Sequence, residues 1–153
     1  MHVRDAMNTS VRTVTPDTKI LEVASLMTLY RYQGLPVIDA GDALVGVIAE
    51  RDLLHSLFPK LESLMAEGMH SVDYDKEMAR YKEILGLKVA DLMTPNPVTV
   101  DPEMHVLRAA TIMVRHNFRR IPVAEGSKLV GMLSLGDVHK AIFHSNLAQG
   151  LSV

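Results

Sequence analysis

The sequence predicts an α/β fold (α+β) made of two related β-α-β-β-α motifs, and two observations lead to this prediction. Residues of the same type recur at one constant spacing: Asp5 matches Asp91 and Val37 matches Val123, each 86 positions further on. Each copy also carries helical and strand periodicity in the same order. Because a sheet of two or three strands does not bury both of its faces alone, we expect the copies to pack through their sheets around a pseudo-twofold axis.

The repeat covers apolar, proline and acidic positions. Beyond the first strand of each copy the spacing falls to 85, which the loss of one residue from a turn explains. The repeated unit is about 50 residues long and indicates a duplication. The matching positions are Val3, Asp5, Met7, Thr13, Val14, Pro16, Leu21, Ala24, Met27, Pro36, Val37, Leu44, Val45, Gly46 and Asp52 in the first copy, and Val89, Asp91, Met93, Thr99, Val100, Pro102, Leu107, Ala110, Met113, Pro122, Val123, Leu129, Val130, Gly131 and Asp137 in the second.

The first copy shows the order of the elements. Residues 3–7 predict a short helical turn, and residues 11–14 predict an extended segment that ends at a Thr-Pro-Asp turn. Residues 35–38 and 44–48 predict two strands joined by an Ala-Gly-Asp turn. A last helix is expected to begin near Glu50. Both strands are apolar without alternation, so we expect both of their faces to be covered.

An amphipathic helix connects the extended segment to the first strand. Asp17 or Thr18 is available as its N-cap. Met27 and its counterpart Met113 lie at helical spacing among apolar residues, and we interpret both as core filling. The apolar positions of the helix are Ile20, Val23, Ala24, Met27 and Tyr30.

These patterns divide the chain into motif 1 over residues 1–54, a helical insert over residues 55–88, motif 2 over residues 89–146 and a C-terminal tail over residues 147–153. The insert is longer than most connections in compact domains, so we expect it to carry helices. It is either a solvated hairpin that covers the flank of the module or a surface for a partner. One short helix is predicted by Leu57, Leu61, Leu64 and Met65, and a second by Asp73 as cap, Tyr74, Met78, Tyr81 and Leu85, with Gly86 at its end.

The candidate functional element is a strand that runs into a helix near the C-terminus. Ser134 and Asp137 place a hydroxyl and a carboxylate three residues apart, at the start of a helix predicted over residues 137–143. The backbone N–H groups and the helix dipole at such a turn favour a phosphate, and a carboxylate suits the hydroxyls of a ribose. The same Ser-x-x-Asp pattern is also an N-terminal cap that needs no ligand, so both interpretations stay open.

The repeated unit resembles the CBS motif, the cystathionine-β-synthase-type domain, and the pair is similar to a tandem CBS or Bateman module. Three pieces in the same order in both copies carry the resemblance, which covers the chain apart from the insert. The pieces are Val3-Arg4-Asp5-Ala6-Met7, Gly34-Leu35-Pro36-Val37 and Leu44-Val45-Gly46-Val47-Ile48-Ala49-Glu50-Arg51-Asp52 in the first copy, and residues 89–100, Arg120-Ile121-Pro122-Val123 and Leu129-Val130-Gly131-Met132-Leu133-Ser134-Leu135-Gly136-Asp137 in the second.

The resemblance implies a regulatory module that binds AMP, ADP or ATP in clefts between the motifs, with no required cofactor and no metal. In such modules the leading segment of one motif serves the cleft whose carboxylate comes from the other. The implied ribose contacts are Asp137, Ser134 and Asp52; the implied phosphate contacts are Arg119, Arg120 and His116; the implied adenine contacts are Thr9, Val11, Met132 and Leu133 at the Asp137 site, and Pro95 and Pro97 at the Asp52 site.

A positive run supports phosphate binding independently. Residues 114–120 hold three arginines and a histidine close to the candidate turn, and guanidinium groups bind phosphate bidentately. The alternative is an ordinary solvated helix end, where cations also favour the dipole.

The first copy departs from the second at the key positions. Ala49 stands where the second copy has Ser134, and Gln33-Gly34 replaces the two arginines. Asp52 keeps its carboxylate, although Arg51 could pair with it instead. We therefore expect unequal clefts, with the Asp137 site the stronger.

Composition excludes several other functions. The formal net charge is −2, so no basic excess favours nucleic acid, and no apolar run approaches the length of a membrane span. The sequence shows no signal segment and no cysteine, and we expect a cytoplasmic protein. The seven histidines lack metal-ligand spacing, and Ser134 has no evident base in its own segment, so we expect no enzyme activity.

The sequence therefore predicts a sensor of adenine nucleotides that acts through a homodimer or through an unknown regulated protein. One alternative is a ligand-free interaction or oligomerisation domain, in which Ser134 and Asp137 only cap a helix. A second alternative is a sensor of another adenosyl ligand, such as S-adenosylmethionine.

Overall fold

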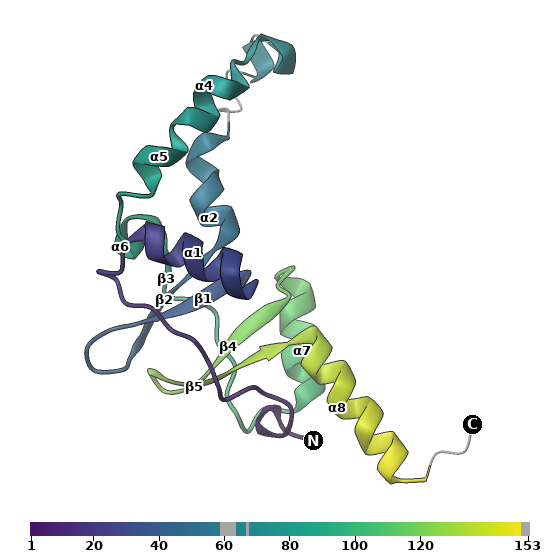
Figure 1. The fold of residues 1–153 in the computed structure, drawn as a ribbon. Coiled ribbons are helices and arrows are strands. Elements are labelled where there is room, and N and C mark those ends of the chain that lie inside the picture. The colour runs from purple at the N-terminus through teal and green to yellow at the C-terminus, as the bar shows by residue number, and fades with distance from the viewer. Residues whose placement is uncertain (59–63, 67, 151–153) are drawn as a thin grey trace. The chain divides into compact units, whose positions relative to one another are not determined.

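The computed structural model describes residues 1–58, 64–66 and 68–150 (Figure 1). The chain divides into two compact units, and each is described by itself. Unit 1 holds the described residues of Met1–Arg12, Ala40–Leu44 and Asn96–Val153, and unit 2 holds those of Thr13–Asp39 and Val45–Pro95.

Unit 2 is built on a three-stranded sheet in the order β1-β2-β3. Strand β3 runs antiparallel to β2, with Pro95 opposite Gly46. The elements are α1 (Ile20–Tyr30), β1 (Gly34–Ile38), β2 (Leu44–Ala49), α2 (Glu50–Leu54), α6 (Val89–Leu92) and β3 (Thr94–Pro95). Its core holds Val14, Ile20, Val23, Leu26, Met27, Leu35, Val37, Ile48, Leu53, Ile84 and Val89.

Unit 1 is built on an antiparallel pair of strands, in which Ile121 lies opposite Leu133. The sequence of elements is η1 (Val3–Asp5, a 3-10 turn), α7 (Val106–Arg115), β4 (Arg120–Glu125), β5 (Lys128–Ser134) and α8 (Leu135–Ala148). Its core holds Val3, Val100, Val106, Ala109, Met113, Ile121, Val123, Leu133 and Val138. The strands and the helices that follow them agree with the predicted α/β order of elements.

The two motifs exchange their leading segments. In unit 1, Val3 of the first motif donates its N–H to Met104 O (2.8 Å). In unit 2, Val89 of the second motif donates its N–H to Thr18 O (2.9 Å). Both valines are fully buried. Each compact unit therefore consists mainly of one motif plus the start of the other.

The predicted caps of helix α1 were wrong. Its N-cap is Lys19, which makes no side-chain cap bond, while the Ile20 and Leu21 N–H groups donate to the carbonyls of Leu87 and Leu85 (2.9 and 3.1 Å). Backbone carbonyls at the end of the insert thus satisfy the start of the helix, which leaves nothing for a side chain to cap.

Asp17 and Thr18, the predicted caps, have other partners. A carboxylate oxygen of Asp17 lies 3.6 Å from Lys88 Nζ, and Thr18 Oγ1 accepts the Thr15 N–H (3.1 Å).

The apolar face of α1 differs from the prediction at one position. Tyr30 is 64% exposed, whereas Leu26, one turn earlier, is buried. The predicted core methionines are confirmed, because Met27 is 4% and Met113 0% exposed.

The extended segments before α1 and α7 form single bridges and no full strands. Val14 pairs in parallel with Val37, and Val100 pairs in parallel with Val123. Each motif therefore begins with one bridge in place of the first strand of the predicted β-α-β-β-α order.

The insert carries short helices, as predicted. Asp73 caps α4 by accepting the Lys76 N–H (3.1 Å), which confirms the predicted cap. The predicted single helix is divided at Arg80, and Ile84 in its second half is buried in the core of unit 2. Leu61, part of the other predicted helix, lies outside the described residues. The bounds are η2 (His55–Leu57), η3 (Met69–Ser71), α4 (Tyr74–Ala79) and α5 (Tyr81–Ile84).

Helix α8 is longer than the predicted range of residues 137–143, since it begins at Leu135 and ends at Ala148. None of the helices in the described residues combines the length and the apolar character that a membrane span requires.

Candidate functional site

Strand β5 passes directly into helix α8 at Ser134, which is the N-cap of the helix. The Ser134 N–H donates to Asp137 Oδ2 (2.9 Å), and the Asp137 N–H donates to Ser134 Oγ (3.0 Å). This reciprocal pair is a capping box, which satisfies two N–H groups that the helix itself cannot. The cap that the sequence left as one interpretation is therefore present.

The capping box leaves some hydrogen-bonding groups of Ser134 and Asp137 without a described partner. Among the described residues, Asp137 makes no side-chain hydrogen bond besides the one at Oδ2, so Oδ1 keeps its lone pairs. The Ser134 hydroxyl accepts in the cap and can still donate its own proton. Both residues are only partly buried. A carboxylate oxygen and a hydroxyl proton thus remain for a second partner.

Two arginines are tied to this turn through their backbone. The Leu135 N–H, in the first turn of α8, donates to Arg119 O (3.1 Å). Arg120 lies opposite Ser134 in the β4–β5 ladder. Both residues are exposed, and within the described residues no ion pair engages either guanidinium. Positive charge with unoccupied donors therefore lies next to the start of α8.

The segment that carries Thr9 and Val11 also belongs to unit 1. Asn8 bonds to Met132 in both directions, since the N–H of each donates to the carbonyl of the other (both 2.9 Å). The Ser10 N–H donates to Asn8 Oδ1 (3.0 Å). Thr9 is exposed and Val11 is partly buried. The leading segment is thus fixed to the strand that leads into the Ser134–Asp137 turn.

Three of the predicted ligand contacts have side chains or backbone groups that already pack against or bond to other parts of the protein. Leu133 is 0% exposed and packs in the core of unit 1, so its side chain offers no surface to a ligand. Both backbone groups of Met132 are engaged by Asn8, which leaves its partly buried side chain as the main group for an adenine contact. The His116 ring stacks on Phe118, with centroids 5.1 Å apart and planes at 12°. No described contact joins His116 to the turn.

The corresponding turn of unit 2 has half of the arrangement. The Ala49 N–H donates to Asp52 Oδ2 (2.7 Å), but the methyl group of Ala49 has no oxygen to return the bond. The Glu50 N–H donates to Gln33 O (3.1 Å), so a neutral residue occupies the place of Arg119. Pro95 lies opposite Gly46 on the strand that leads to this turn. Pro97 belongs to unit 1.

The Asp52 carboxyl differs electrostatically from an ordinary surface carboxyl. Burial removes part of its hydration and raises its pKa above the usual value. The hydrogen bond from Ala49 and the nearby charges of Arg51 and His55 act in the opposite direction without cancelling the rise. A raised pKa in a turn of this kind is compatible with a binding site and also with simple burial.

The same carboxylate cap occurs at two further turns, so the cap alone does not mark a ligand site. Asp5 Oδ2 accepts the His2 N–H (2.8 Å), and Asp91 Oδ2 accepts the Lys88 N–H (2.9 Å). Asp5 and Asp91 are each the third residue of the short helix in a leading segment, the position that Asp137 holds in α8. These two aspartates are natural controls for a capping role without a ligand.

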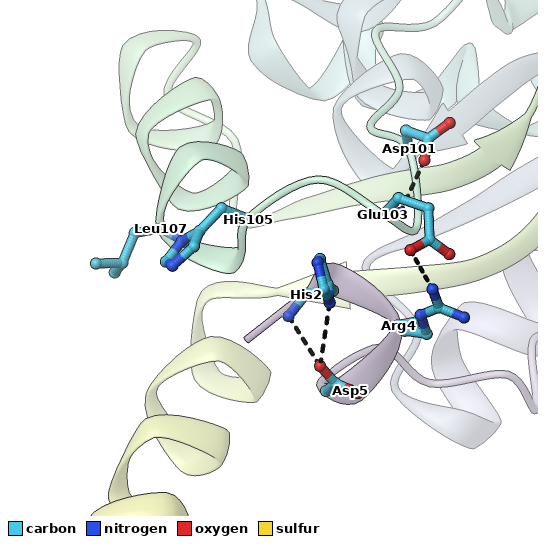
Figure 2. A network of polar contacts seen from close by, with 7 residues as sticks. All are labelled: His2, Arg4, Asp5, Asp101, Glu103, His105 and Leu107. Atoms are coloured by element: carbon cyan, nitrogen blue, oxygen red, sulfur yellow. Dashed lines mark hydrogen bonds and ion pairs between the residues drawn. The ribbon is translucent and has the colours of Figure 1, made fainter.

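The leading segment of unit 1 is held by charged contacts as well (Figure 2). Arg4 forms an ion pair with Glu103, and the Glu103 N–H donates to Asp101 Oδ1 (2.7 Å). His2 and Asp5 form the second pair of contacts in this network. In the part of the chain that is described, no group of three histidine, aspartate or glutamate side chains could hold a metal ion. We assign the network to anchoring.

Asn8 is the residue of this site that the sequence did not reveal. The sequence contains part of the signal for its side-chain bond to Ser10, because an Asn side chain readily accepts a backbone N–H two residues further on. Its pairing with Met132 depends on the exchange of segments, which no local pattern indicates.

Comparison with known proteins identifies the repeated unit. The family model of the CBS domain matches residues 3–59 and 89–144. CBS domain-containing protein CBSX2 of Arabidopsis thaliana is 31% identical over 144 residues, which cover 86% of this chain and 58% of that protein. CBS domain-containing protein YhcV of Bacillus subtilis is 29% identical over 136 residues, which cover 89% of this chain and 81% of that protein.

A solved structure shares the fold and carries a ligand. The crystal structure of CBSX2 in complex with AMP is 31% identical, has a TM-score of 0.73 and covers 95% of this chain and 98% of that chain. The inosine-5′-monophosphate dehydrogenase of Korarchaeum cryptofilum is 31% identical over 129 residues, which cover only 21% of that enzyme. Similar domain pairs thus occur both in proteins named only for their CBS domains and within an enzyme.

Proposed function

The chain belongs to the CBS domain family, and from this premise we propose that it is a regulatory module that binds an adenine nucleotide at the Ser134–Asp137 turn. In this proposal Asp137 Oδ1 accepts from the ribose hydroxyls, and the Ser134 hydroxyl donates to ribose or phosphate. Arg119 and Arg120 bind the phosphates. Met132, Thr9 and Val11 contribute to the surface for the base.

One observation carries the proposal. The capping box leaves Asp137 Oδ1 and the Ser134 proton without a described partner, next to two exposed arginines in the same unit. A carboxylate accepts only, and a ribose offers two adjacent hydroxyl donors. The arginines supply the opposite charge that phosphate requires. The AMP complex of CBSX2, at 31% identity, supports the choice of an adenosine nucleotide.

We propose further that occupancy of this turn is passed on through a homodimer or to a regulated protein, and that the module performs no catalysis itself. A ligand can regulate only if it binds two arrangements of the assembly with different affinity. Cytoplasmic localisation remains a prediction, and the names of related plant proteins specify chloroplast or mitochondrion.

The second candidate function is a ligand-free interaction domain. The observation that favours it is the complete capping box at Ser134 and Asp137, because a cap explains both residues without a ligand. The same bond at Asp5 and Asp91 shows that this chain uses the carboxylate cap elsewhere.

Thermal unfolding with AMP, ADP, ATP and S-adenosylmethionine separates the two candidates. A nucleotide at about 100 times its dissociation constant stabilises the protein by about 2.7 kcal/mol, so we expect a clear rise in Tm with at least one of them. Asp137→Ala should lose the nucleotide-dependent rise. Asp91→Ala, which removes the same type of cap from α6, should lower the basal Tm and keep the rise.

No rise with any of the four ligands would favour the interaction domain. A rise only with S-adenosylmethionine would keep the adenosyl site and overturn the choice of an adenine nucleotide.

A further inference from the structure

Strand β5 has a glycine, Gly131, at a position where the leading segment of unit 1 packs against it. A Cβ atom built on Gly131 would lie 2.9 Å from Asn8 O and 2.9 Å from Met7 Sδ. Ordinary contacts of a Cβ atom begin near 3.4 Å. Residues 7–8 therefore occupy the space that a side chain at position 131 would fill.

The segment is anchored at this point and shaped just after it. Asn8 exchanges two backbone hydrogen bonds with Met132, the neighbour of Gly131. The side chain of Asn8 then accepts the Ser10 N–H, which folds the chain around Thr9. Thr9 is thus held between two residues that are fixed in place.

Unit 2 repeats the close approach with different residues. A Cβ atom built on Gly46 would lie 2.7 Å from Met93 Sδ and 3.0 Å from Thr94 O. Thr94 lies opposite Val47, the neighbour of Gly46. The same pairing of a strand glycine with a segment methionine in both units indicates a common requirement for close docking.

We propose that Gly131 is a positioning residue for the nucleotide site. By lacking a side chain it lets Met7 and Asn8 dock on β5, and this docking sets the place from which Thr9 and Val11 meet the ligand. The inference rests on the proposed function for its ligand. Since the ligand contacts the docked segment, binding and docking stabilise each other.

Three variants test the role of Gly131. Gly131→Ala places a methyl group against backbone and thioether atoms. Gly46→Ala is the matched control, because it makes the same clash in unit 2. Asn8→Pro is a second disruption, which removes the N–H that bonds to Met132 O and adds nothing to the strand.

The first readout is amide hydrogen exchange, which requires no ligand. In Gly131→Ala and in Asn8→Pro, we expect faster exchange of the Met132 amide, while the amides of the β4–β5 ladder stay protected. Gly46→Ala should leave the Met132 amide unchanged. Unchanged exchange of Met132 in Gly131→Ala would overturn the docking role.

The second readout is the Kd for AMP at a temperature where every variant is folded. Gly131→Ala and Asn8→Pro should each weaken AMP binding about tenfold, and Gly46→Ala should not weaken binding at the Asp137 site. Val100→Ala, a truncation in the core of unit 1, should lower Tm with little change in Kd. If the increase in Kd were proportional to the decrease in Tm in all four variants, the loss of affinity would reflect loss of stability, and the positioning role would be overturned.

If the wild-type protein binds neither AMP nor another adenosyl ligand, the proposed function fails. The hydrogen-exchange data still test whether Gly131 allows the segment to dock on β5. Failure of nucleotide binding and failure of the docking role can therefore be distinguished.

Discussion

The turns of the two units have the same backbone frame and different side chains. In unit 1, Ser134 and Asp137 form both halves of a capping box beside two arginines, whereas in unit 2 Ala49 and Asp52 form one half beside a glutamine and a glycine. The carbonyls of Arg119 and Gln33 accept equivalent bonds, both of 3.1 Å. The shared backbone hydrogen bonds therefore belong to the fold, whereas the complete capping box with two arginines beside it is found at the turn of unit 1 and not at the turn of unit 2.

Removal of each carboxylate should give the largest difference between the units. Asp137→Ala deletes a charged acceptor of ribose hydroxyl groups, and hydrogen bonds to charged groups contribute about 1.5–3 kcal/mol. We expect the Kd for AMP in calorimetry to rise about tenfold to hundredfold. Asp52→Ala should raise it less, because its turn lacks both the hydroxyl and the arginines. Equal losses would contradict the asymmetry between the units.

The arginines should come next in the size of their effect. The double variant Arg119→Ala, Arg120→Ala should weaken ATP and AMP binding about tenfold, because charge-assisted bonds to phosphate are lost, and should leave adenosine binding unchanged. The Arg115→Ala variant is the control, since this residue ends α7 and is exposed in the same positive run. A similar loss in the control would assign the effect to overall charge.

Reciprocal exchange of the cap residue should change stability by a smaller amount. Ala49→Ser supplies an oxygen for the Asp52 N–H and should stabilise unit 2 by about 0.5–1 kcal/mol, while Ser134→Ala should destabilise unit 1 by a similar amount. Chemical denaturation of both variants measures the two changes. Loss of stability in Ala49→Ser would show that the turns do not share one frame.

The smallest expected effect is the pH dependence at Asp52. Burial raises the pKa of this carboxyl, so its contribution to stability is full below the unfolded pKa and is lost as the pH rises through the folded pKa. The charged form therefore costs stability at neutral pH. Asp52→Asn, which keeps an oxygen for the Ala49 N–H, should raise the urea midpoint at pH 7, and the gain should shrink toward pH 4. A gain that grows on acidification would contradict the raised pKa.

Local patterns predicted most of the elements and the cap itself. The repeat predicted the strands around Val37 and Val123, because they recur at a constant spacing in the two copies. Local patterns predicted the Asp73 cap in the insert and the buried methionines, because these depend on residues close in sequence. The capping box at Ser134 was one of two stated interpretations, and the geometry contains it.

The features that the sequence did not predict depend on contacts between segments that are far apart in the chain. The predicted caps of α1 failed because Leu85 and Leu87 of the insert, more than sixty residues further along the chain, supply backbone acceptors. The burial of the Leu133 side chain also depends on distant residues, because it packs in the core of unit 1 on the strand paired with β4; the contact of this residue with adenine stays a prediction. Asn8 was missed for the same reason, since its partner Met132 is more than a hundred residues away.

The contact between Asp137 and the ribose is tested most directly by comparing AMP with 2′-deoxy-AMP in the wild type and in Asp137→Ala. If Asp137 holds the ribose, the deoxynucleotide should bind the wild type about tenfold more weakly than AMP, and Asp137→Ala should bind both nucleotides equally. Calorimetry of the four combinations gives the coupling between the hydroxyl and the carboxylate. An equal preference for AMP over 2′-deoxy-AMP in both proteins would show that Asp137 does not contact the ribose and only caps its helix.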